Sequence, residues 1–248
     1  MPGSGRPAAL VVGAGDFIGA AIARRFAREG YAACMGRRHG EKLEPLADEI
    51  RAAGGEAHPF TLDARDEDQV VARFAEIERD VGPLEVVVFN VGANVSFPIR
   101  DTTSRVFTKV WQMACLGGFL TGREAARHMV PRRKGTLLFT GATASVRGAA
   151  GYAAFAAAKA GLRALAQSMA RELGPENIHV AHVIIDAGVD TAWVREMVEK
   201  RTGKSADELP EGALVDPASI AEAYWFLHQQ PRDAWTFELD LRPAIERW

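Results

Sequence analysis

The chain has 248 residues, 48% of them hydrophobic and 25% charged, and a formal net charge of −2. This length suits one large α/β domain, and the small net charge gives no reason to expect a nucleic acid or a membrane surface as partner. Cys34 and Cys115 lie in apolar runs, which indicates buried free thiols and no metal site. No apolar run is as long as a membrane span, and the polar N-terminus does not resemble a signal peptide, so we expect a cytoplasmic protein.

Short apolar runs alternate with helical patterns along the whole chain. The apolar runs predict strands at Ala8–Val12, Ala32–Met35, Ala57–Leu62, Val86–Asn90, Thr136–Thr140, Val180–Ile185 and Phe237–Leu241. The helical patterns predict helices at Phe17–Glu29, Glu41–Ala53, Glu67–Val81, Ser104–Val130, Tyr152–Leu173 and Pro217–Gln229. Apolar strands without clean alternation, separated by helices, are typical of a doubly wound parallel sheet. We therefore expect a single α/β domain over residues 1–248.

One long stretch, Ala187–Val215, has neither pattern and carries Gly188, Gly203 and Gly212. Irregular loops of this length inside a compact domain usually act as lids or binding loops. We predict that residues 187–215 form a substrate lid within the domain.

A glycine-rich turn follows the first predicted strand and precedes the first predicted helix. Glycines let the backbone approach a pyrophosphate, and the N-terminus of the helix then faces the anion. The alternative is a turn with a structural role alone. The candidate cofactor-binding residues in this turn are Gly13, Gly15, Asp16, Phe17, Ile18 and Gly19.

The end of the second predicted strand indicates which cofactor binds. An acidic residue there would bind the ribose hydroxyls of NAD, but Arg37 and Arg38 follow the strand instead. Guanidinium groups can hold a 2′-phosphate in bidentate fashion, so NADP(H) is favoured and NAD(H) is the alternative. Two considerations oppose this choice: the arginines are also typical of solvated surface charge, and Asp16 would repel a nearby phosphate.

The stretch from Tyr152 to Lys159 resembles the catalytic helix of the short-chain dehydrogenase/reductase family, whose signature is Tyr-x-x-x-Lys. Phe155 stands at the position of the tyrosine. The glycine-rich turn resembles the Gly-x-x-x-Gly-x-Gly loop of the same family, with Phe17 in place of the middle glycine. The resemblance covers nearly the whole chain. It implies a Rossmann-type sheet of about seven parallel strands in the order 3-2-1-4-5-6-7 and an NAD(P)(H)-dependent oxidoreductase.

The resemblance also implies further cofactor-binding residues. Asp63, followed by Ala64, matches the acid that contacts adenine. The turn from Asn90 to Gly92 matches the one beneath the adenosine, and Thr191 matches the threonine that holds the carboxamide. Gly188 falls in the segment that usually contains Pro-Gly, and Lys159 belongs to both the cofactor set and the catalytic set.

The four catalytic positions of the family are Asn, Ser, Tyr and Lys, and three of them are changed here. The asparagine falls on Ala114, the serine on Ala142 and the tyrosine on Phe155, while Lys159 is retained. Losing a positioned general acid usually lowers the rate by ~10²–10⁴, and losing an oxyanion donor lowers it by ~10²–10³. We therefore predict a nucleotide site that is kept and a proton-transfer site that is altered.

Other side chains near these positions are candidates for the lost roles. Tyr152 gives Tyr-x₆-Lys, a spacing that resembles the enoyl-thioester reductases, although a packing role at the pocket rim is the alternative. Thr143 is a candidate replacement for the serine, with Ser145 a further hydroxyl nearby. His182 is a candidate acid or an interior group.

Two functions remain open at this point. One is an NADP(H)-dependent oxidoreductase with altered proton delivery, acting on a small apolar carbonyl, alcohol or activated alkene. The other is a catalytically inactive cofactor-binding protein that serves as a sensor or partner. The predicted apolar pocket walls are Val95, Phe97, Tyr152, Trp193 and Met197. Self-association as a dimer or tetramer is expected through the predicted helices Ser104–Val130 and Tyr152–Leu173, with Trp235–Pro243 as a second contact and a monomer as the alternative.

Overall fold

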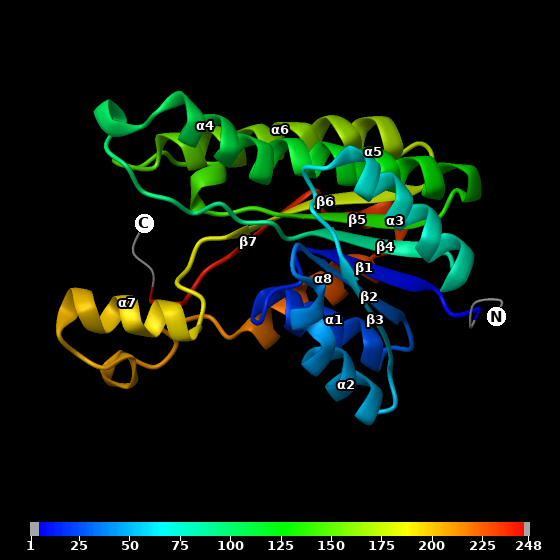
Figure 1. Ribbon diagram of the computed structural model, residues 1–248, viewed down its shortest axis with the longest axis horizontal. Coiled ribbons are helices and arrows are strands. Elements are labelled where there is room, and N and C mark those ends of the chain that lie inside the picture. The colour runs from blue at the N-terminus through cyan, green and yellow to red at the C-terminus, as the bar shows by residue number, and fades with distance from the viewer. Residues whose placement is uncertain (1–4, 246–248) are drawn as a thin grey trace.

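Seven parallel strands form one sheet in the order β3-β2-β1-β4-β5-β6-β7 in the computed structural model, which describes residues 5–245 (Figure 1). The strands are β1 Ala8–Val12, β2 Ala32–Arg37, β3 Glu56–Thr61, β4 Leu84–Phe89, β5 Gly135–Thr140, β6 Ile178–Ile185 and β7 Glu238–Leu241. Every residue of β1 and β6 is buried, which explains why these runs lack polar alternation. The predicted fold class and strand order are confirmed.

Helices cover both faces of this sheet. They are α1 Ile18–Arg28, α2 Glu44–Ala52, α3 Glu67–Asp80, α4 Ser104–Trp111, α5 Gly117–Met129, α6 Ala153–Leu173, α7 Ala192–Thr202 and α8 Pro217–His228. Helices α1, α2 and α8 lie on one face, and α3, α4, α5 and α6 lie on the other (Figure 1). Each face has its own core, with Phe26 and Tyr224 central to the first and Phe74 and Phe139 to the second. No helix within residues 5–245 combines the length and hydropathy needed to cross a bilayer.

The predicted helix Ser104–Val130 runs without a break from Ser104 to Met129, but it contains one irregular turn. A π-turn at Gln112–Leu116 separates α4 from α5, and the N–H of Gly117 bonds to the carbonyl oxygen of Gln112. After this turn Gly118 faces α6 so closely that a Cβ would lie 2.3 Å from Cδ1 of Leu162. A π-turn adds one residue to a single helical turn, which barely changes the spacing of the apolar residues. The apolar pattern of the sequence therefore did not reveal this turn.

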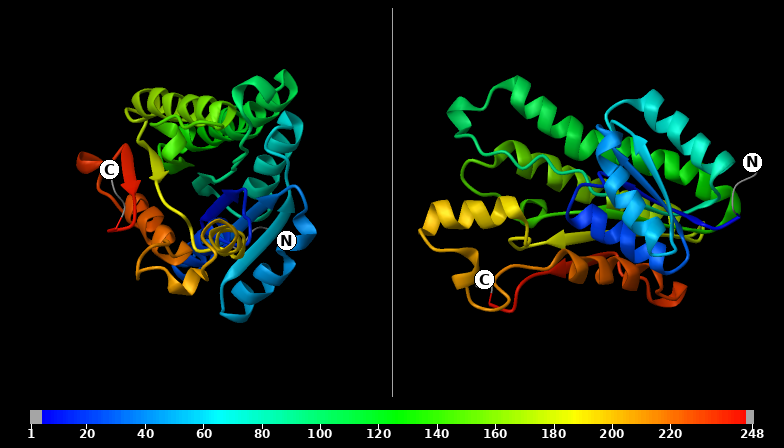
Figure 2. Two further views of the ribbon diagram at one scale, coloured as in Figure 1. Left: turned by 90° about the vertical axis from the view of Figure 1, so that its left-hand side faces the viewer. Right: turned by 60° about the horizontal axis from the view of Figure 1, so that its bottom comes forward.

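The predicted irregular segment Ala187–Val215 is also only partly irregular, since it contains α7. The hydroxyl of Thr191 caps this helix by accepting a hydrogen bond from the N–H of Val194, and Gly203 ends it with φ +69°. A β-bridge between Val189 and Val215 brings the two ends of the segment together. Helix α7 stands away from the sheet at its carboxyl edge (Figures 1 and 2). Its polar composition hid the helical pattern.

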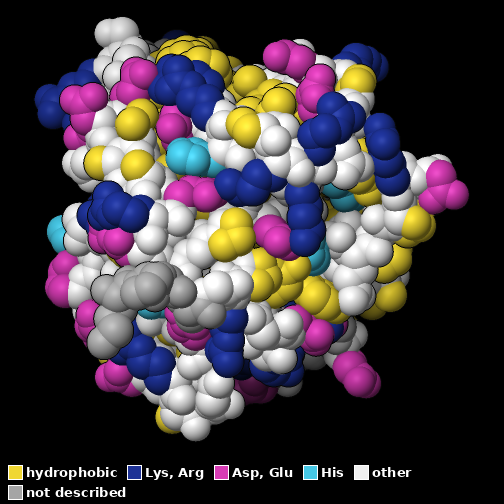
Figure 3. All heavy atoms as spheres, turned by 90° about the vertical axis from the view of Figure 1, so that its right-hand side faces the viewer, with side chains coloured by type: hydrophobic (Ala, Val, Ile, Leu, Met, Phe, Trp, Pro, Cys, Tyr) yellow, Lys and Arg dark blue, Asp and Glu magenta, His cyan; other side chains and the backbone are white. Residues whose placement is uncertain are grey.

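Acidic and basic side chains are interspersed on the end of the molecule where the strands begin (Figure 3). The loop before β5 contributes three ion pairs there: Arg132–Glu78, Arg133–Glu176 and Lys134–Glu85. Exposed pairs of this kind contribute about 0–1 kcal/mol each to stability. This end is therefore a solvated surface, and the site must be sought at the opposite edge, where parallel sheets bind ligands.

Candidate functional site

Two cavities adjoin each other at the carboxyl edge of the sheet. The first, of about 220 Å³, lies at the ends of β1, β2 and β3. The second, of about 370 Å³, lies between the ends of β1, β4, β5 and β6. Both are lined by Gly13, Gly15, Asn90, Val91 and Gly92, so they form one cleft around the glycine-rich turn. This is the edge at which doubly wound sheets bind dinucleotides.

The backbone of the glycine-rich turn is closely packed against the end of β4. Gly13 has φ +87°, and a Cβ there would lie 2.8 Å from the carbonyl oxygen of Asn90. A Cβ on Gly19 would lie 2.7 Å from Cα of Ala14, whereas Gly15 has open space around it. The side-chain amide of Asn90 donates to the carbonyl oxygen of Gly13 at 3.0 Å. The turn is therefore fixed on one side and open on the other, which fits a pyrophosphate at the N-terminus of α1.

Phe17 and Ile18 also line the second cavity, at the start of α1. The side chain of Phe17 stands where the family loop has its middle glycine and is 38% exposed. It therefore forms part of the cavity wall without blocking the turn.

The first cavity is rich in cations. Arg37, Arg38, His39 and Arg65 all line it. Arg65 holds Asp63 through two hydrogen bonds, of 2.9 Å and 2.5 Å, and these bonds lower the pKa of that carboxyl. Asp63 and Ala64 lie in the lining, as expected for an adenine contact, but the sequence did not show that Arg65 would engage the acid. The only indication in the sequence was that Arg65 follows Asp63 by two residues, which is close enough for the two side chains to meet within one turn.

Lys159 is the central polar group of the second cavity. Its side chain is buried, and Nζ donates to the carbonyl oxygens of Thr140 at 2.8 Å and Val91 at 3.1 Å. Burial lowers the pKa of Lys159 to about 8. Phe155 precedes it by one turn of α6, and the ammonium lies 5.9 Å from the centroid of this ring. An ammonium that remains protonated near neutral pH thus faces a cavity with apolar walls.

The three residues that the sequence predicted at the family's catalytic positions come together beside this lysine. Ala114, from the π-turn, and Phe155, from α6, belong to one buried apolar cluster, and Ala142 packs against it. Ala142 and Phe155 also line the cavity. Side chains without a titratable group therefore occupy the places from which the family donates hydrogen bonds and protons.

Thr143 is held away from the role that the sequence suggested for it. Its hydroxyl donates a short hydrogen bond to Asp186, which follows β6. Arg147 and Arg242 lie 3.7 Å and 3.4 Å from the same carboxylate. Thr143 is not among the described residues that line the cavity. The hydroxyl proton of Thr143 is therefore engaged by a carboxylate 43 residues further along the chain. The spacing of residues in the sequence does not indicate this partner.

The other candidate residues lie in different surroundings. Tyr152 immediately precedes α6 and packs against the apolar cluster around Phe155, outside the cavity lining. Thr191 does line the cavity, while its oxygen caps α7. The carbonyl oxygen of Gly188 accepts a hydrogen bond from the N–H of Val215 at 2.9 Å.

His182 is an interior group. It is fully buried, and its Nδ1 lies 3.1 Å from Oε2 of Glu238, which Arg163 also binds. Burial lowers the pKa of His182 to about 4, so the imidazole is neutral at physiological pH. Its Nε2 has no hydrogen-bond partner within residues 5–245 and is not in the cavity lining. A neutral, enclosed imidazole is a poor proton donor for a substrate.

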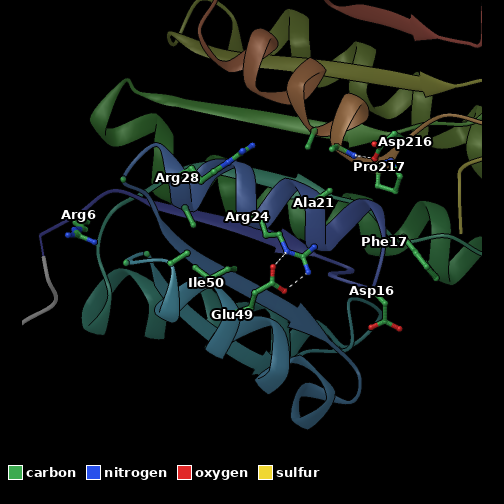
Figure 4. Close-up of a pocket in the computed structure, with 17 residues that line it drawn as sticks. Arg6, Asp16, Phe17, Ala21, Arg24, Arg28, Glu49, Ile50, Asp216 and Pro217 are labelled. Atoms are coloured by element: carbon green, nitrogen blue, oxygen red, sulfur yellow. Dashed lines mark hydrogen bonds and ion pairs between the residues drawn. The ribbon is translucent and has the colours of Figure 1, made fainter. Parts of the chain in front are cut away.

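A larger hollow, of about 710 Å³, lies along α1 between α2 and α8 (Figure 4). The ion pair of Arg24 with Glu49 crosses it at 2.7 Å. Among the described residues that line this hollow, only Asp16 and Phe17 belong to the glycine-rich turn, and Lys159, Gly13 and Gly15 are not part of the lining. The chemistry therefore belongs to the smaller cleft.

A doubly wound parallel sheet with a glycine-rich turn and a two-part cleft at its carboxyl edge defines a dinucleotide-binding protein of the Rossmann class. The family model described as short chain dehydrogenase matches residues 7–202, and the chain belongs to this family. The resemblance seen in the sequence is thus confirmed.

Several known proteins are similar to this chain over nearly its whole length. MabA, a 3-oxoacyl-acyl-carrier-protein reductase of Mycobacterium avium, is 33% identical over 231 residues, covering 90% of this chain and 85% of that protein. A short-chain dehydrogenase from Rhodopseudomonas palustris has a TM-score of 0.80 at 53% identity, covering 96% of this chain and 99% of that one. A variant of the actinorhodin polyketide ketoreductase, solved with NADPH, has a TM-score of 0.88 at 25% identity, with 100% of both chains covered.

Proposed function

We propose that this protein is an NADP(H)-dependent oxidoreductase in which Lys159, in place of a tyrosine, delivers the proton to a small apolar substrate. One observation carries the proposal. Among the described residues that line the second cavity, Lys159 is the only one with a titratable side chain. Lys159 lies one turn of α6 after Phe155, which stands where the family has its tyrosine, and its ammonium is 5.9 Å from the centroid of that ring.

The residues of the cleft fit a dinucleotide. The turn around Gly15 leaves backbone open to a pyrophosphate, and Arg37 and Arg38 supply cations for a 2′-phosphate. The similar polyketide ketoreductase was solved with NADPH, which supports the same choice here. When bound, the cofactor supplies or accepts the hydride, and the side chains of this protein must manage the accompanying proton.

The hydrogen bonds of Lys159 suit it to this task. Two of its three N–H groups are held by the carbonyl oxygens of Thr140 and Val91, which leaves one for the cavity. As a hydride reaches the substrate carbon, this ammonium can give its proton to the developing oxyanion or enolate and become a neutral amine. Because burial holds the pKa of Lys159 at about 8, the loss of the proton costs little free energy near neutral pH.

Three of the predicted apolar pocket walls are exposed side chains, although none of them is among the described residues that line the two cavities of the cleft. Trp193 and Met197 lie one turn apart on α7 and are exposed, as is Phe97 in the loop after β4. Phe97 is tied to the start of α6 by a 2.8 Å hydrogen bond from its N–H to the carbonyl oxygen of Gly151. MabA and the polyketide ketoreductase are by name reductases of carbonyl compounds, which supports carbonyls and conjugated alkenes as the first substrates to test.

The Lys159→Met variant tests the assignment. NADPH binding is followed by fluorescence, and turnover is followed by NADPH oxidation with ketones and enones. We expect the variant to lose about 100-fold or more of kcat while it still binds NADPH. Because the donor is the protonated amine, wild-type kcat/KM for reduction should fall as the pH rises past about 8.

Lys109→Met, on the exposed side of α4, is the matched control and should retain the activity. Turnover by Lys159→Met within about threefold of the wild type would eliminate Lys159 as the donor. Failure of the wild type to bind either nicotinamide nucleotide would eliminate the whole proposal.

A further inference from the structure

Arg37 and Arg38 are neighbours in the sequence, but they have different partners. Nη1 of Arg37 lies 3.0 Å from Oδ1 of Asp16, which projects from the glycine-rich turn. The side chain of Asp16 is 71% exposed and that of Arg37 is 24% exposed. Asp16, visible in Figure 4, reaches across the end of β1 to the end of β2. One of the two guanidinium groups offered to a 2′-phosphate is therefore already paired.

The other basic residues of the cavity are mostly engaged as well. Arg65 is held in bidentate fashion by Asp63, and His39 lies 3.5 Å from Glu41. Within residues 5–245, no carboxylate forms an ion pair with Arg38. The charge of Arg38 contributes to the lowered pKa of Asp63, but Arg38 is the cation of this cavity that an incoming phosphate would meet without breaking an ion pair.

A 2′-phosphate and the Asp16 carboxylate would compete for one guanidinium. Both are anions, so they also repel each other at this distance. An exposed ion pair of Asp with Arg is weak, whereas a bidentate pair of Arg with phosphate is stronger. The phosphate should therefore prevail, and the exposed Asp16 side chain can turn into solvent. The pyrophosphate is common to both cofactors, whereas a cofactor with a 2′-hydroxyl places no anion against Arg37, so the competition with Asp16 distinguishes only the 2′-phosphate.

We propose that Asp16 sets the cofactor specificity of this protein by competing with the 2′-phosphate for Arg37, while Arg38 is the principal phosphate ligand. This inference rests on the proposed binding of NADP(H). It gives Asp16 a role opposite to that of a ligand: in the free protein it neutralises Arg37, and it reduces the preference for NADP(H) over NAD(H).

Dissociation constants for a double-mutant cycle test this competition. The proteins are the wild type, Asp16→Asn, Arg37→Met and the double variant, each titrated with NADPH and NADH. Titration with 2′,5′-ADP and 5′-AMP isolates the phosphate from the nicotinamide. We expect Asp16→Asn to tighten NADPH and 2′,5′-ADP about threefold to tenfold and to leave NADH and 5′-AMP within about twofold. In the Arg37→Met background the gain should shrink to about twofold or less.

Two further variants complete the experiment. Arg38→Met should weaken NADPH about 30-fold or more, and by more than Arg37→Met does. Asp48→Asn removes an equally exposed carboxylate that pairs with Arg51 at 3.1 Å on α2, so it serves as the matched control and should change nothing.

The results separate this inference from the proposed function. If the wild type binds NADPH and Asp16→Asn leaves its affinity unchanged, or shifts NADH equally, the competition is refuted and the proposed function stands. If the gain persists in full in the Arg37→Met background, the role of Arg37 is refuted. If the wild type binds no nicotinamide nucleotide, the proposed function fails and this inference fails with it.

Discussion

Lys159 and Phe155 are the two residues that decide how a proton is delivered in the proposed reaction. They lie one helical turn apart on α6, both are buried, and both line the second cavity. A phenol at position 155 would add an oxygen near an ammonium that already lies 5.9 Å from the ring centroid. Such a phenol would have its pKa lowered by the charge and would take over proton delivery.

Restoring the missing groups therefore predicts a gain in carbonyl reduction. We expect the variant Phe155→Tyr with Ala142→Ser to raise kcat for a simple ketone about 100-fold or more, since it adds both a general acid and an oxyanion donor. Initial rates of NADPH oxidation measure this change. Phe107→Tyr, at an exposed position on α4, adds a phenol elsewhere and should have no effect. An unchanged rate in a folded, NADPH-binding double variant would contradict the assignment of these positions.

For single residues, the sequence indicated where side chains lie in the fold better than which other side chains they contact. The glycine-rich turn, Arg38 and Lys159 lie in the cleft as expected, because spacing along a strand, turn or helix fixes where a residue falls. The pairing of Thr143 with Asp186 was not predictable, since it joins residues 43 positions apart through the ends of β5 and β6. Whether a hydroxyl is free to act depends on such tertiary partners.

Two elements show the same limit on a larger scale. The π-turn at Gln112–Leu116 was not predicted, and the two glycines that follow it, Gly117 and Gly118, lie so close to their neighbours that a Cβ on either would crowd them. Helix α7 was missed because its apolar side chains do not gather on one buried face: Val194 is buried, whereas Trp193 and Met197 are exposed. Helices and strands whose apolar residues recur at regular spacing were predicted. The π-turn and α7, which lack such spacing, were not.

Helix α8 is held in place at its last residue by a partly buried histidine, His228, which predicts loss of stability in acid. His228 bonds to the hydroxyls of Tyr31 at 2.7 Å and Thr136 at 2.9 Å, and burial lowers its pKa to about 4. Between pH 6.5 and 4 the unfolded chain takes up a proton that the folded protein does not, so stability is full above pH 6.5 and falls as the pH falls. From pH 7 to 5 this residue should account for about 2 kcal/mol.

Urea unfolding at pH 7 and pH 5 measures this contribution. His228→Gln should be less stable than the wild type at pH 7, because it loses two partly buried hydrogen bonds, and should lose about 2 kcal/mol less between the two pH values. His39→Gln, at an exposed position, should follow the wild-type profile. Since burial also lowers the pKa of His182 to about 4, part of the acid sensitivity should remain in the variant. A pH profile of His228→Gln parallel to that of the wild type would refute the assignment.

The outer face of the molecule over α4, α5 and α6 is unusually apolar. Phe107, Trp111 and Phe119 are each about 40% exposed there. Ala157 and Ala160 on the neighbouring helix α6 are also exposed and allow another helix to approach closely. Exposed aromatic side chains beside small residues on neighbouring helices are typical of association surfaces. The face coincides with the helices from which the sequence predicted self-association.

We therefore expect a dimer in solution whose interface is this face. Trp111→Glu should raise the dimer dissociation constant about tenfold or more, because it places a charge in the centre of a buried apolar contact. Sedimentation equilibrium over a range of protein concentrations measures the change.

Ile99→Glu alters an even more exposed apolar residue, before α4, and is the control that should leave the dimer intact. The cleft lies at the carboxyl edge of the sheet, away from this face, so the Trp111→Glu monomer should still bind NADPH. A wild-type monomer at all concentrations would contradict the assignment, and it would leave the exposed aromatic side chains without an explanation.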